Sequence, residues 1–358
     1  MSNSLLMPHI FTAMSISLHL RYVELSGSII AIMMTRCRTV YGGEHKMEVV
    51  AIGEILAEVM RPNVDMPLDQ PGQFIGPFPS GAPAIFADQV VRLGHSAAIV
   101  GAVGKDDFGK CILERLNKDG VVTKYVNVVD GVATGVAFVA YFRDGSRKFI
   151  FHFGNSAAGF LPSADEVDLT GVKFVHICGC TLTGGGRLRE ECYKLVERAV
   201  KLGISISFDP NLRPELLSDV SAVREICKPV LSHASVVSTG LAELLAIANE
   251  SDEKAACEKL LNEGVSIVAL KLGKAGCRIY SQEAFVESLP FDVEAVDPTG
   301  AGDCFDAAVV VGLIEGMPLE DIARLANACG ALATTKLGPM EGTPWRKDVE
   351  RFILGFER

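Results

Sequence analysis

The sequence predicts an α/β fold with a mostly parallel central sheet that is covered by helices on both faces. From Met47 onward, short apolar runs alternate with segments of helix length. Strands that are apolar along their whole length are typical of parallel sheets buried on both faces. The chain also has 35 glycines, which suit the tight turns that such a fold needs between strands and helices.

The expected central strands are six apolar runs. They are Val49–Ile52, Ala97–Val100, Val172–Ile177, Ser205–Phe208, Ser235–Val237 and Ile267–Leu270. Ligands of parallel sheets bind at the carboxyl ends of the strands. We therefore expect the residues just after predicted strands to converge on one edge, namely Glu54, Gly81, Asp209, Lys271 and the loop at Gly300.

Two stretches interrupt this alternation of strands and helices. Ala57–Pro79 is rich in Pro and Gly, and Thr134–Phe153 has period-two patterning on both sides of Asp144-Gly145. The second stretch predicts a β-hairpin with a tight primed turn. From the pattern alone, this hairpin is equally compatible with an ordinary surface hairpin and with part of a functional element.

Composition limits the classes of function. The chain has 358 residues, of which 49% are apolar, so it can bury one large core, although its length permits one to three domains. A net charge of −10 argues against a broad grip on nucleic acid or on an anionic membrane. The ten cysteines include no C-x-x-C pair, and Cys178 and Cys180 are only two apart. We therefore expect reduced thiols and a cytoplasmic protein, without a metal or disulfide framework.

Residues 1–46 differ from the rest of the chain. They are rich in Ser and Met, lack strand-helix alternation, and contain no apolar run long enough to cross a membrane. We expect a disordered extension, or a start codon placed too early, with the folded domain over residues 47–358. Met47 directly precedes the first core strand and is a natural beginning.

The most informative motif is Asp297-Pro298-Thr299-Gly300-Ala301-Gly302-Asp303, which runs into the apolar segment Cys304–Leu313. Its glycines let the backbone turn tightly and present N–H groups, and the positive end of a helix dipole points to the same place. This arrangement predicts an anion site. Asp303 is then a candidate general base, although Asp is also a favoured capping residue and the glycines could only close a turn.

Two further elements are expected around this motif. A strand-like segment, Asp292–Val296, precedes it. A second helix with many small residues, Leu319–Thr335, follows and carries Asn327.

At this point the chain resembles the ribokinase-like (PfkB) family of carbohydrate kinases, from Met47 to the C-terminus. The Asp297–Asp303 motif resembles the C-terminal signature, D-T-x-G-A-G-D, with Pro298 at the second position. Ser80-Gly81-Ala82-Pro83-Ala84 is similar to the N-terminal glycine signature, and Phe208–Pro214 is similar to a segment of the fructokinase and 2-keto-3-deoxygluconate kinase branches. The resemblance implies a three-layer αβα domain, with a small β-sheet lid formed by segments near 57–79 and 134–153.

For the nucleotide, the resemblance implies ATP and Mg²⁺ as cofactors, with Gly300, Ala301 and Gly302 forming an anion hole beside Asp303. The segment beside the ATP phosphates corresponds to Lys271, Gly273 and Gly276, which could also be a plain turn between strands. Other cofactor-binding candidates are Asn327 and Ser238. The family's Asn-x-x-Glu motif is degraded here, and Glu243 is a candidate that reaches the metal through water.

For the sugar, the resemblance implies Glu54 and Glu58 as carboxylates that accept hydrogen bonds from hydroxyl groups, with Gly81 and Ala82 letting the backbone approach. Ile85 stands where many relatives have Asn. Arg147 and Arg213 are candidate cations near the pocket. Lid and loop arginines are, however, often solvated.

Phe153 bears on the choice of sugar. It stands where 2-keto-3-deoxygluconate kinases have Arg, ahead of Ser156-Ala157-Ala158. This departure favours a neutral keto sugar, fructose- or tagatose-like. The alternatives are a 2-keto-3-deoxygluconate kinase, a nucleoside kinase and a non-catalytic sugar-binding relative. A nicotinamide dehydrogenase would need G-x-G-x-x-G where this chain has Gly53-Glu54-Ile55-Leu56. Exposed lid edges would further allow a homodimer through the lid.

Overall fold

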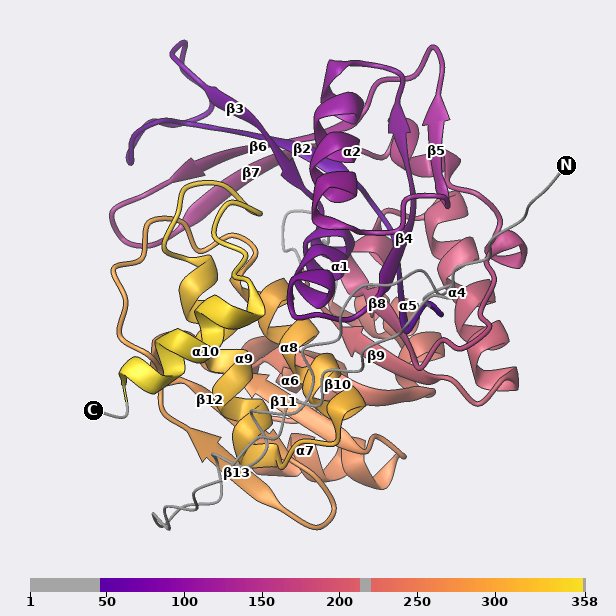
Figure 1. Ribbon diagram of the computed structural model, residues 1–358, viewed down its shortest axis with the longest axis vertical. Coiled ribbons are helices and arrows are strands. Elements are labelled where there is room, and N and C mark those ends of the chain that lie inside the picture. The colour runs from indigo at the N-terminus through magenta and orange to yellow at the C-terminus, as the bar shows by residue number, and fades with distance from the viewer. Residues whose placement is uncertain (1–45, 213–219, 357–358) are drawn as a thin grey trace, which may run out of the picture. The chain divides into compact units, whose positions relative to one another are not determined.

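Seven parallel strands, extended on one side by an antiparallel hairpin, form the central sheet of the computed structural model (Figure 1). The structure describes residues 46–212 and 220–356. The predicted N-terminal extension therefore lies outside the described residues, apart from residue 46. The sheet order is β13-β12-β11-β10-β9-β8-β1-β4-β5. The parallel strands are β1 (Val49–Ile52), β4 (Ala97–Gly104), β5 (Val126–Val129), β8 (Phe174–Cys178), β9 (Ser205–Asp209), β10 (Ala234–Gly240) and β11 (Ile267–Lys271). The hairpin is β12 (Cys277–Tyr280) and β13 (Phe285–Ser288).

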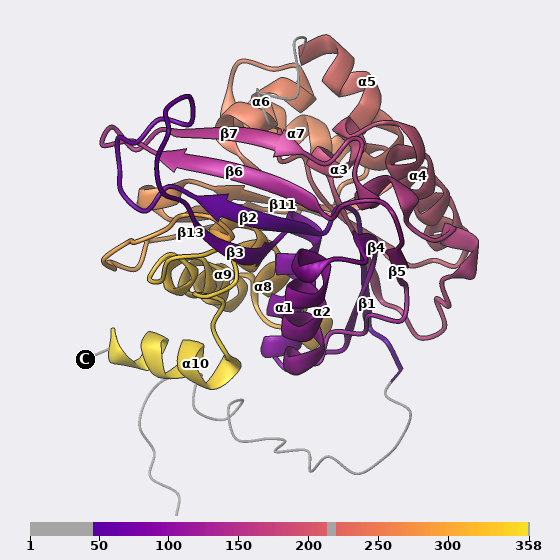
Figure 2. The same ribbon diagram turned by 90° about the horizontal axis from the view of Figure 1, so that it is seen from above.

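Helices cover both faces of this sheet, as Figure 2 shows. One face carries α1 (Ala82–Arg92), α2 (Asp107–Asp119), α8 (Ala301–Glu315), α9 (Leu319–Ala333) and α10 (Arg346–Gly355). The other carries α3 (Gly179–Thr183), α4 (Gly186–Lys201), α5 (Val220–Leu231), α6 (Leu241–Ala248) and α7 (Glu253–Asn262). Short 3₁₀ turns lie at η1 (Ala157–Phe160), η2 (Ala164–Glu166) and η4 (Gly273–Ala275).

The sequence of β1 explains why both faces are covered. Successive side chains of a strand point to opposite faces. Val49 and Ala51 pack in the core under α1 and α8, whereas Val50 and Ile52 pack in the core under α4. All four side chains are fully buried. The three-layer αβα architecture that the sequence predicts is thus confirmed.

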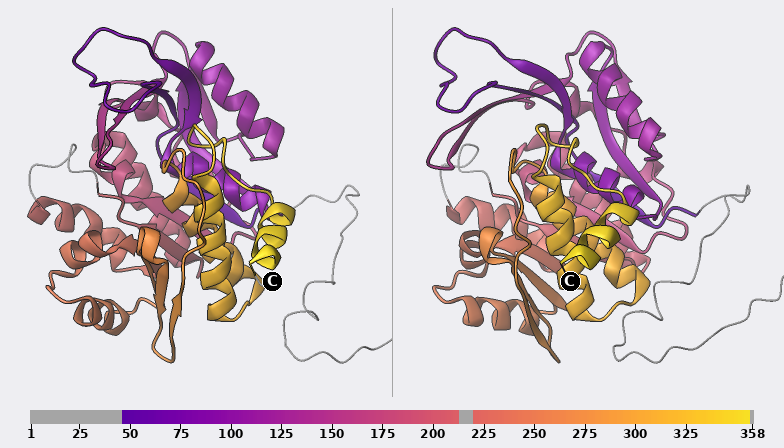
Figure 3. Two further views of the ribbon diagram at one scale, coloured as in Figure 1. Left: turned by 90° about the vertical axis from the view of Figure 1, so that its left-hand side faces the viewer. Right: turned by 60° about the vertical axis from the view of Figure 1, so that its left-hand side comes forward.

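A second, smaller sheet forms the lid. Its order is β3 (Ile75–Ser80), β2 (Leu56–Met60), β6 (Gly135–Tyr141) and β7 (Arg147–His152). Only the central β2–β6 pair is parallel. Figure 3 shows these strands projecting from the layered body. The two stretches that interrupt the strand-helix alternation are therefore the lid.

Two local expectations were wrong. Asp292–Val296 is not a strand: the backbone N–H groups of Val296 and Asp297 instead donate to the carbonyl of Thr334 at the end of α9, so the segment has no strand partner. The lid hairpin does not have a primed turn. Its loop, Arg143-Asp144-Gly145, has positive φ only at Gly145, which is the geometry of a three-residue loop with a glycine bulge.

The order of the sheet reverses between β1 and β8. β1 lies between β4 and β8 and runs parallel to both, while the chain continues outward in opposite directions from this pair. In open α/β sheets, ligands bind at such a reversal, outside the carboxyl ends of the strands.

None of the helices in the described residues has the length and apolar character of a membrane span.

Candidate active site

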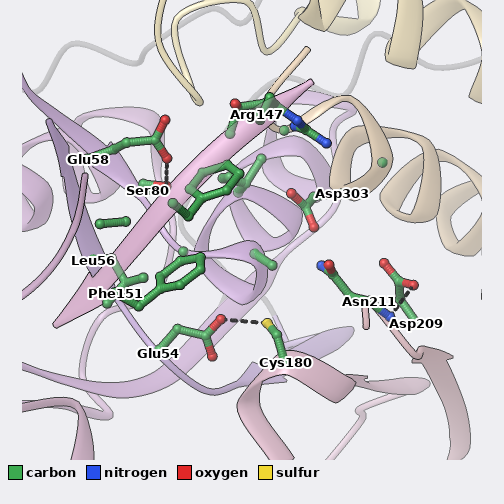
Figure 4. Close-up of a pocket in the computed structure, with 18 of the residues that line it drawn as sticks. Glu54, Leu56, Glu58, Ser80, Arg147, Phe151, Cys180, Asp209, Asn211 and Asp303 are labelled. Atoms are coloured by element: carbon green, nitrogen blue, oxygen red, sulfur yellow. Dashed lines mark hydrogen bonds between the residues drawn. The ribbon is translucent and has the colours of Figure 1, made fainter. Parts of the chain in front are cut away.

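A cavity of about 230 Å³ lies at this reversal, between the carboxyl ends of the central strands and the inner face of the lid (Figure 4). Its walls contain all the residues that the sequence predicts to converge, together with other candidate site residues. They are Glu54, Glu58, Gly81, Ala82, Arg147, Asp209, Glu243, Lys271, Gly300, Gly302 and Asp303. Ser80 is the last residue of lid strand β3 and Gly81 directly follows it, so the lid and the central sheet both contribute to the site.

The signature loop forms one end of the cavity. Gly300 is the N-cap of α8 with φ +83°, and no side chain caps the helix there. A Cβ at this position would lie 2.4 Å from the carbonyl oxygen of Pro339, so the site requires glycine. Asp303 is not the capping residue; it lies in the first turn, 7% exposed, and Figure 4 shows its carboxylate facing the cavity.

Asp297 holds the signature loop in place. It is fully buried, and its Oδ1 accepts hydrogen bonds from the Thr299 N–H at 2.9 Å and from the Tyr141 hydroxyl at 2.6 Å. Its Oδ2 accepts from the Gly338 N–H at 2.9 Å. Burial, and then the negative charge of Asp297, raise the pKa of Tyr141 well above its usual value, so the phenol stays protonated and donates.

Beneath Asp303 lies a buried charged cluster of Lys271, Asp209 and Asp306. The Lys271 ammonium group donates to Asp209 Oδ2 at 3.0 Å and to both oxygens of Asp306, at 3.0 and 3.1 Å. Ser238 also donates to Asp306. Burial raises the pKa of Asp209 to about 7 against the attraction of Lys271, and burial raises the pKa of Asp306. The donors of Lys271 and Ser238 are thus engaged within the protein.

Three carboxylates of this region offer a set of oxygen donors. Asp209, Asp303 and Asp306 each have an oxygen within 4.8 Å of the others. Carboxylate oxygens suit a hard divalent cation. Lys271 contacts both oxygens of Asp306, and the two oxygens of Asp209 accept from Lys271 and from the Asn211 N–H, so both carboxylates already have partners within the protein. Glu243 also lines the cavity, but its two oxygens accept from the N–H groups of Leu212, at 2.8 Å, and Gly240, at 2.9 Å.

The opposite end of the cavity contains Glu54 and Glu58. Glu54, 3% exposed, accepts hydrogen bonds from the Cys180 thiol at 2.8 Å and the Thr181 hydroxyl at 2.5 Å. Glu58, 2% exposed, accepts from the Ser80 hydroxyl at 3.2 Å. These donors orient both carboxylates, and Figure 4 shows the Glu54–Cys180 and Glu58–Ser80 pairs on the wall away from Asp303. Such oriented carboxylates can accept hydrogen bonds from the hydroxyl groups of a polyol.

One face of lid strand β7 covers the cavity. Arg147, Phe149 and Phe151 alternate along the strand, and Phe153 follows it with the same spacing; all four line the cavity. The rings of Phe149 and Phe151 stack at 5.3 Å, and the Arg147 guanidinium lies 5.7 Å from the Phe149 ring. Figure 4 shows Arg147 on the Asp303 side of the cavity. β7 and the residue after it thus bring three aromatic rings and one cation to the cavity, with the cation near the signature loop.

Several predicted residues lie away from the cavity walls. The Asn327 amide donates to the carbonyls of Ser288 and Leu289, each at 3.1 Å, so it joins α9 to the end of β13. A Cβ at Gly276 would lie 2.1 Å from the Ser288 carbonyl oxygen, which is a packing reason for this glycine. Gly273 has φ +56° in an open turn. Arg213 lies outside the described residues.

Other residues of the site were not assigned a role from the sequence. They are Tyr141, Phe149, Phe151, Cys180, Thr181, Thr299 and Asp306. The period-two aromatic pattern of 147–153 was a usable signal for the lid wall. Thr299 lies within the signature motif itself, whereas the others carry no local signal, because each acts through a partner distant in sequence.

Comparison with known proteins agrees with this geometry. Residues 46–346 match the model of the pfkB family carbohydrate kinases. The chain is 32% identical to "Probable fructokinase-4" of Arabidopsis thaliana over 327 residues, which are 87% of this chain and 98% of the relative. It is also 32% identical to a fructokinase of Salmonella typhimurium, over 76% of this chain and 91% of the relative.

Solved structures show the same fold. An E. coli protein provisionally described as ribokinase II, in complex with ATP and Mg²⁺, superposes with a TM-score of 0.81 at 41% identity, covering 86% of this chain and 99% of that chain. A fructokinase from Vibrio cholerae, with fructose, ADP and calcium bound, superposes with a TM-score of 0.72 at 23% identity, covering 86% of this chain and 99% of that one. The protein thus belongs to the pfkB family of carbohydrate kinases, enzymes that transfer a phosphoryl group to a sugar hydroxyl.

Proposed function

We propose that this kinase transfers the γ-phosphoryl group of ATP, bound with Mg²⁺, to a hydroxyl group of fructose or a similar neutral keto sugar. The observation that carries the proposal is the cavity itself: oriented carboxylates lie at one end, and Asp303 lies beside the N-terminus of α8 at the other. The names of the fructokinase relatives support a keto sugar as the acceptor.

Asp303 is the proposed general base. A sugar held by Glu54 and Glu58 can turn one hydroxyl toward the Asp303 carboxylate, which takes its proton as the oxygen attacks phosphorus. The N–H groups of Gly300, Ala301 and Gly302 at the start of α8 would hold the phosphate oxygens, aided by the helix dipole. Arg147 adds positive charge at the same end of the cavity.

The nucleotide is proposed to bind beside Lys271, which lines the cavity, next to the turn that contains Gly273 and Gly276 outside the cavity walls. When bound, Mg²⁺ would neutralise charge on the phosphate oxygens. Glu243 is proposed to contact the ion through water, beside the carboxylates of Asp209 and Asp306, while Asp303 acts as the base. Asn327 and Ser238 are proposed to support the nucleotide-binding region without touching the nucleotide, since the Asn327 amide already binds Ser288 and the Ser238 hydroxyl already binds Asp306.

The aromatic wall favours a neutral sugar over a keto acid. Phe149, Phe151 and Phe153 line the cavity, and Figure 4 shows Phe151 above Glu54, where a carboxylate substrate would need a cation. Arg147 lies instead near Asp303, where the phosphoryl group would be (Figure 4).

The test is coupled ADP release with Mg²⁺-ATP and a panel of fructose, tagatose, ribose, 2-keto-3-deoxygluconate and adenosine. We expect turnover on a neutral keto sugar. Replacing Asp303 with Asn should lower kcat by roughly 10²- to 10⁴-fold, the range of general-base catalysis, while sugar binding persists.

The matched control is Asp107→Asn, because Asp107 also lies in the first turn of a helix, α2, but is exposed and away from the cavity. It should leave kcat unchanged. Near-wild-type turnover by the Asp303→Asn variant would remove Asp303 from the mechanism. Turnover on the keto acid alone would overturn the neutral-sugar proposal.

A further inference from the structure

The tip of the lid is hydrogen-bonded to the signature loop through one phenol group. Tyr141 is the last residue of β6, and its hydroxyl lies 2.6 Å from Asp297 Oδ1 and 2.8 Å from Thr299 Oγ1. A phenol has one proton to donate. Since a carboxylate can only accept, that proton goes to Asp297, and the Thr299 hydroxyl donates to the phenol oxygen. The Tyr141 hydroxyl is therefore satisfied by two groups of the signature loop.

Asp297 connects Tyr141 to the backbone around Gly300, which is proposed to bind the phosphate. Asp297 also accepts from the N–H groups of Thr299 and Gly338. The residue after Gly338 is Pro339, whose carbonyl oxygen closes against Gly300, where a Cβ would lie 2.4 Å away. One buried carboxylate thus joins the lid strand, the turn that leads to Gly300 and the segment packed against that glycine.

Tyr141 also lies beside the cation of the lid. In the β6–β7 ladder, Tyr141 is paired directly with Arg147. Directly opposed residues point to the same face of a sheet, and Arg147 lines the cavity. A bond that anchors Tyr141 therefore also restrains the backbone that carries Arg147, because the two strands are hydrogen-bonded to each other.

We propose that Tyr141 is a positioning residue, which uses its bond to Asp297 to align the lid with the phosphate-binding loop during phosphoryl transfer. The proposal rests on the function proposed above. Transfer needs the sugar hydroxyl, covered by the lid, and the phosphoryl group, held at α8, to be in line within a fraction of an ångström. The Tyr141–Asp297 bond connects the two elements that hold these partners.

The test is Tyr141→Phe, which removes the hydroxyl and keeps the ring. We expect kcat to fall about 10- to 100-fold, as for the loss of one hydrogen bond to a charged group at a site that must be aligned. The KM values for ATP and sugar should change by less than about 3-fold, since Tyr141 is proposed to touch neither ligand.

The matched control is Tyr193→Phe. Tyr193, on α4, donates to the Ile226 carbonyl at 2.6 Å and is partly buried, so it loses a similar bond away from the cavity. It should leave kcat within about 2-fold of wild type. A Tyr141→Phe variant with wild-type kcat, or one whose loss of activity is matched by Tyr193→Phe, would overturn the proposal.

A second readout does not require activity. In Tyr141→Phe, amide hydrogen exchange should become faster both at residues 297–302 and at residues 135–152 of the lid. In Tyr193→Phe, exchange in these two segments should stay as in wild type. Faster exchange in the lid alone would refute the coupling. If the wild-type enzyme phosphorylates none of the sugars, that result counts against the proposed function. The hydrogen-exchange measurement would still decide whether Tyr141 couples the lid to the signature loop.

Discussion

Among individual residues, Gly300 combines a conformational and a spatial requirement. Its φ of +83° is unfavourable for any residue with a Cβ, and the Pro339 carbonyl occupies the space that a Cβ would need. The carboxylates at the opposite end of the cavity depend instead on hydrogen-bond donors that fix their orientation. Glu54 is held by the Cys180 thiol and the Thr181 hydroxyl, so its orientation comes from α3, the short helix directly after β8.

Gly300→Ala should therefore be more destabilising than the same change at the other end of α8. Gly316 has a similar left-handed conformation, φ +68°, but open space around a Cβ. We expect Gly316→Ala to lower the free energy of unfolding by about 1 kcal/mol, from the backbone alone. Gly300→Ala should lower it by about 2–4 kcal/mol, since overpacking adds to that strain.

Urea denaturation of the two variants beside wild type measures both values. Equal effects of the two substitutions would show that the contact with Pro339 is not tight, and that conformation alone selects glycine at residue 300.

Between elements, charged side chains join the ends of helices. Glu315, the last residue of α8, accepts two hydrogen bonds at 2.9 Å from Arg346, the first residue of α10, and one at 3.0 Å from His95. Burial would raise the pKa of Glu315, but the bonds from His95 and Arg346 prevail and lower it to about 2. These interactions fasten α10 against the end of the helix whose beginning carries Asp303.

The Glu315 carboxylate should make stability depend on pH. Its pKa is lower in the folded protein than its ordinary value of 4.5, so its contribution is complete above about pH 4.5 and is lost as the pH falls toward 2. Glu315→Gln should lower the free energy of unfolding at pH 7 by about 1–3 kcal/mol. The difference from wild type should shrink as the pH falls below 4.5.

Urea denaturation of wild type and variant at pH 7, 5.5 and 3.5 follows this difference. Glu114→Gln is the control, because Glu114 lies on the surface of α2 and pairs only with the exposed Lys110 at 3.9 Å. A difference that does not change with pH would contradict an ionised Glu315 as its source.

Some of the elements were predictable and others were not. Six of the seven parallel strands described, and α8, follow from apolar runs bounded by glycine and polar residues, because burial on both faces leaves that pattern in the sequence, whereas β5 was not predicted. Asp292–Val296 has the same alternation but no partner strand, and strand formation depends on a partner. The hairpin at Thr134–Phe153 was predictable from period-two patterning, whereas its loop depended on the ladder that ends at Tyr141 and Arg147.

At the scale of the whole molecule, the face of the lid that points away from the cavity exposes apolar side chains. Phe74 and Ile150 are 40% and 41% exposed there, and Phe138 packs edge-on against Phe74 at 5.7 Å. β7 is also an edge strand of the lid sheet. Exposed strand edges and apolar patches favour association. We propose that two copies of the chain form a homodimer through this face.

Ile150→Lys should convert such a dimer to a monomer, because it places a charge in the proposed interface. Sedimentation velocity at several protein concentrations measures the state. Leu354→Lys is the control, since Leu354 is 46% exposed on α10, outside the lid. A wild-type chain that sediments as a monomer, or a dimer that survives Ile150→Lys, would refute an interface at this face.

The sequence by itself determined the class of fold, the two stretches that interrupt the strand-helix alternation and the place of the signature loop. Local rules are enough for these features: alternation reports burial, and glycines in D-P-T-G-A-G-D report backbone conformation. Only the tertiary structure decided that Tyr141 meets Asp297, that Cys180 holds Glu54, and that Lys271 is held by Asp209 and Asp306. The physical reason is that a hydrogen bond needs its two partners within about 3 Å, and in this chain those partners lie 35 to 156 positions apart.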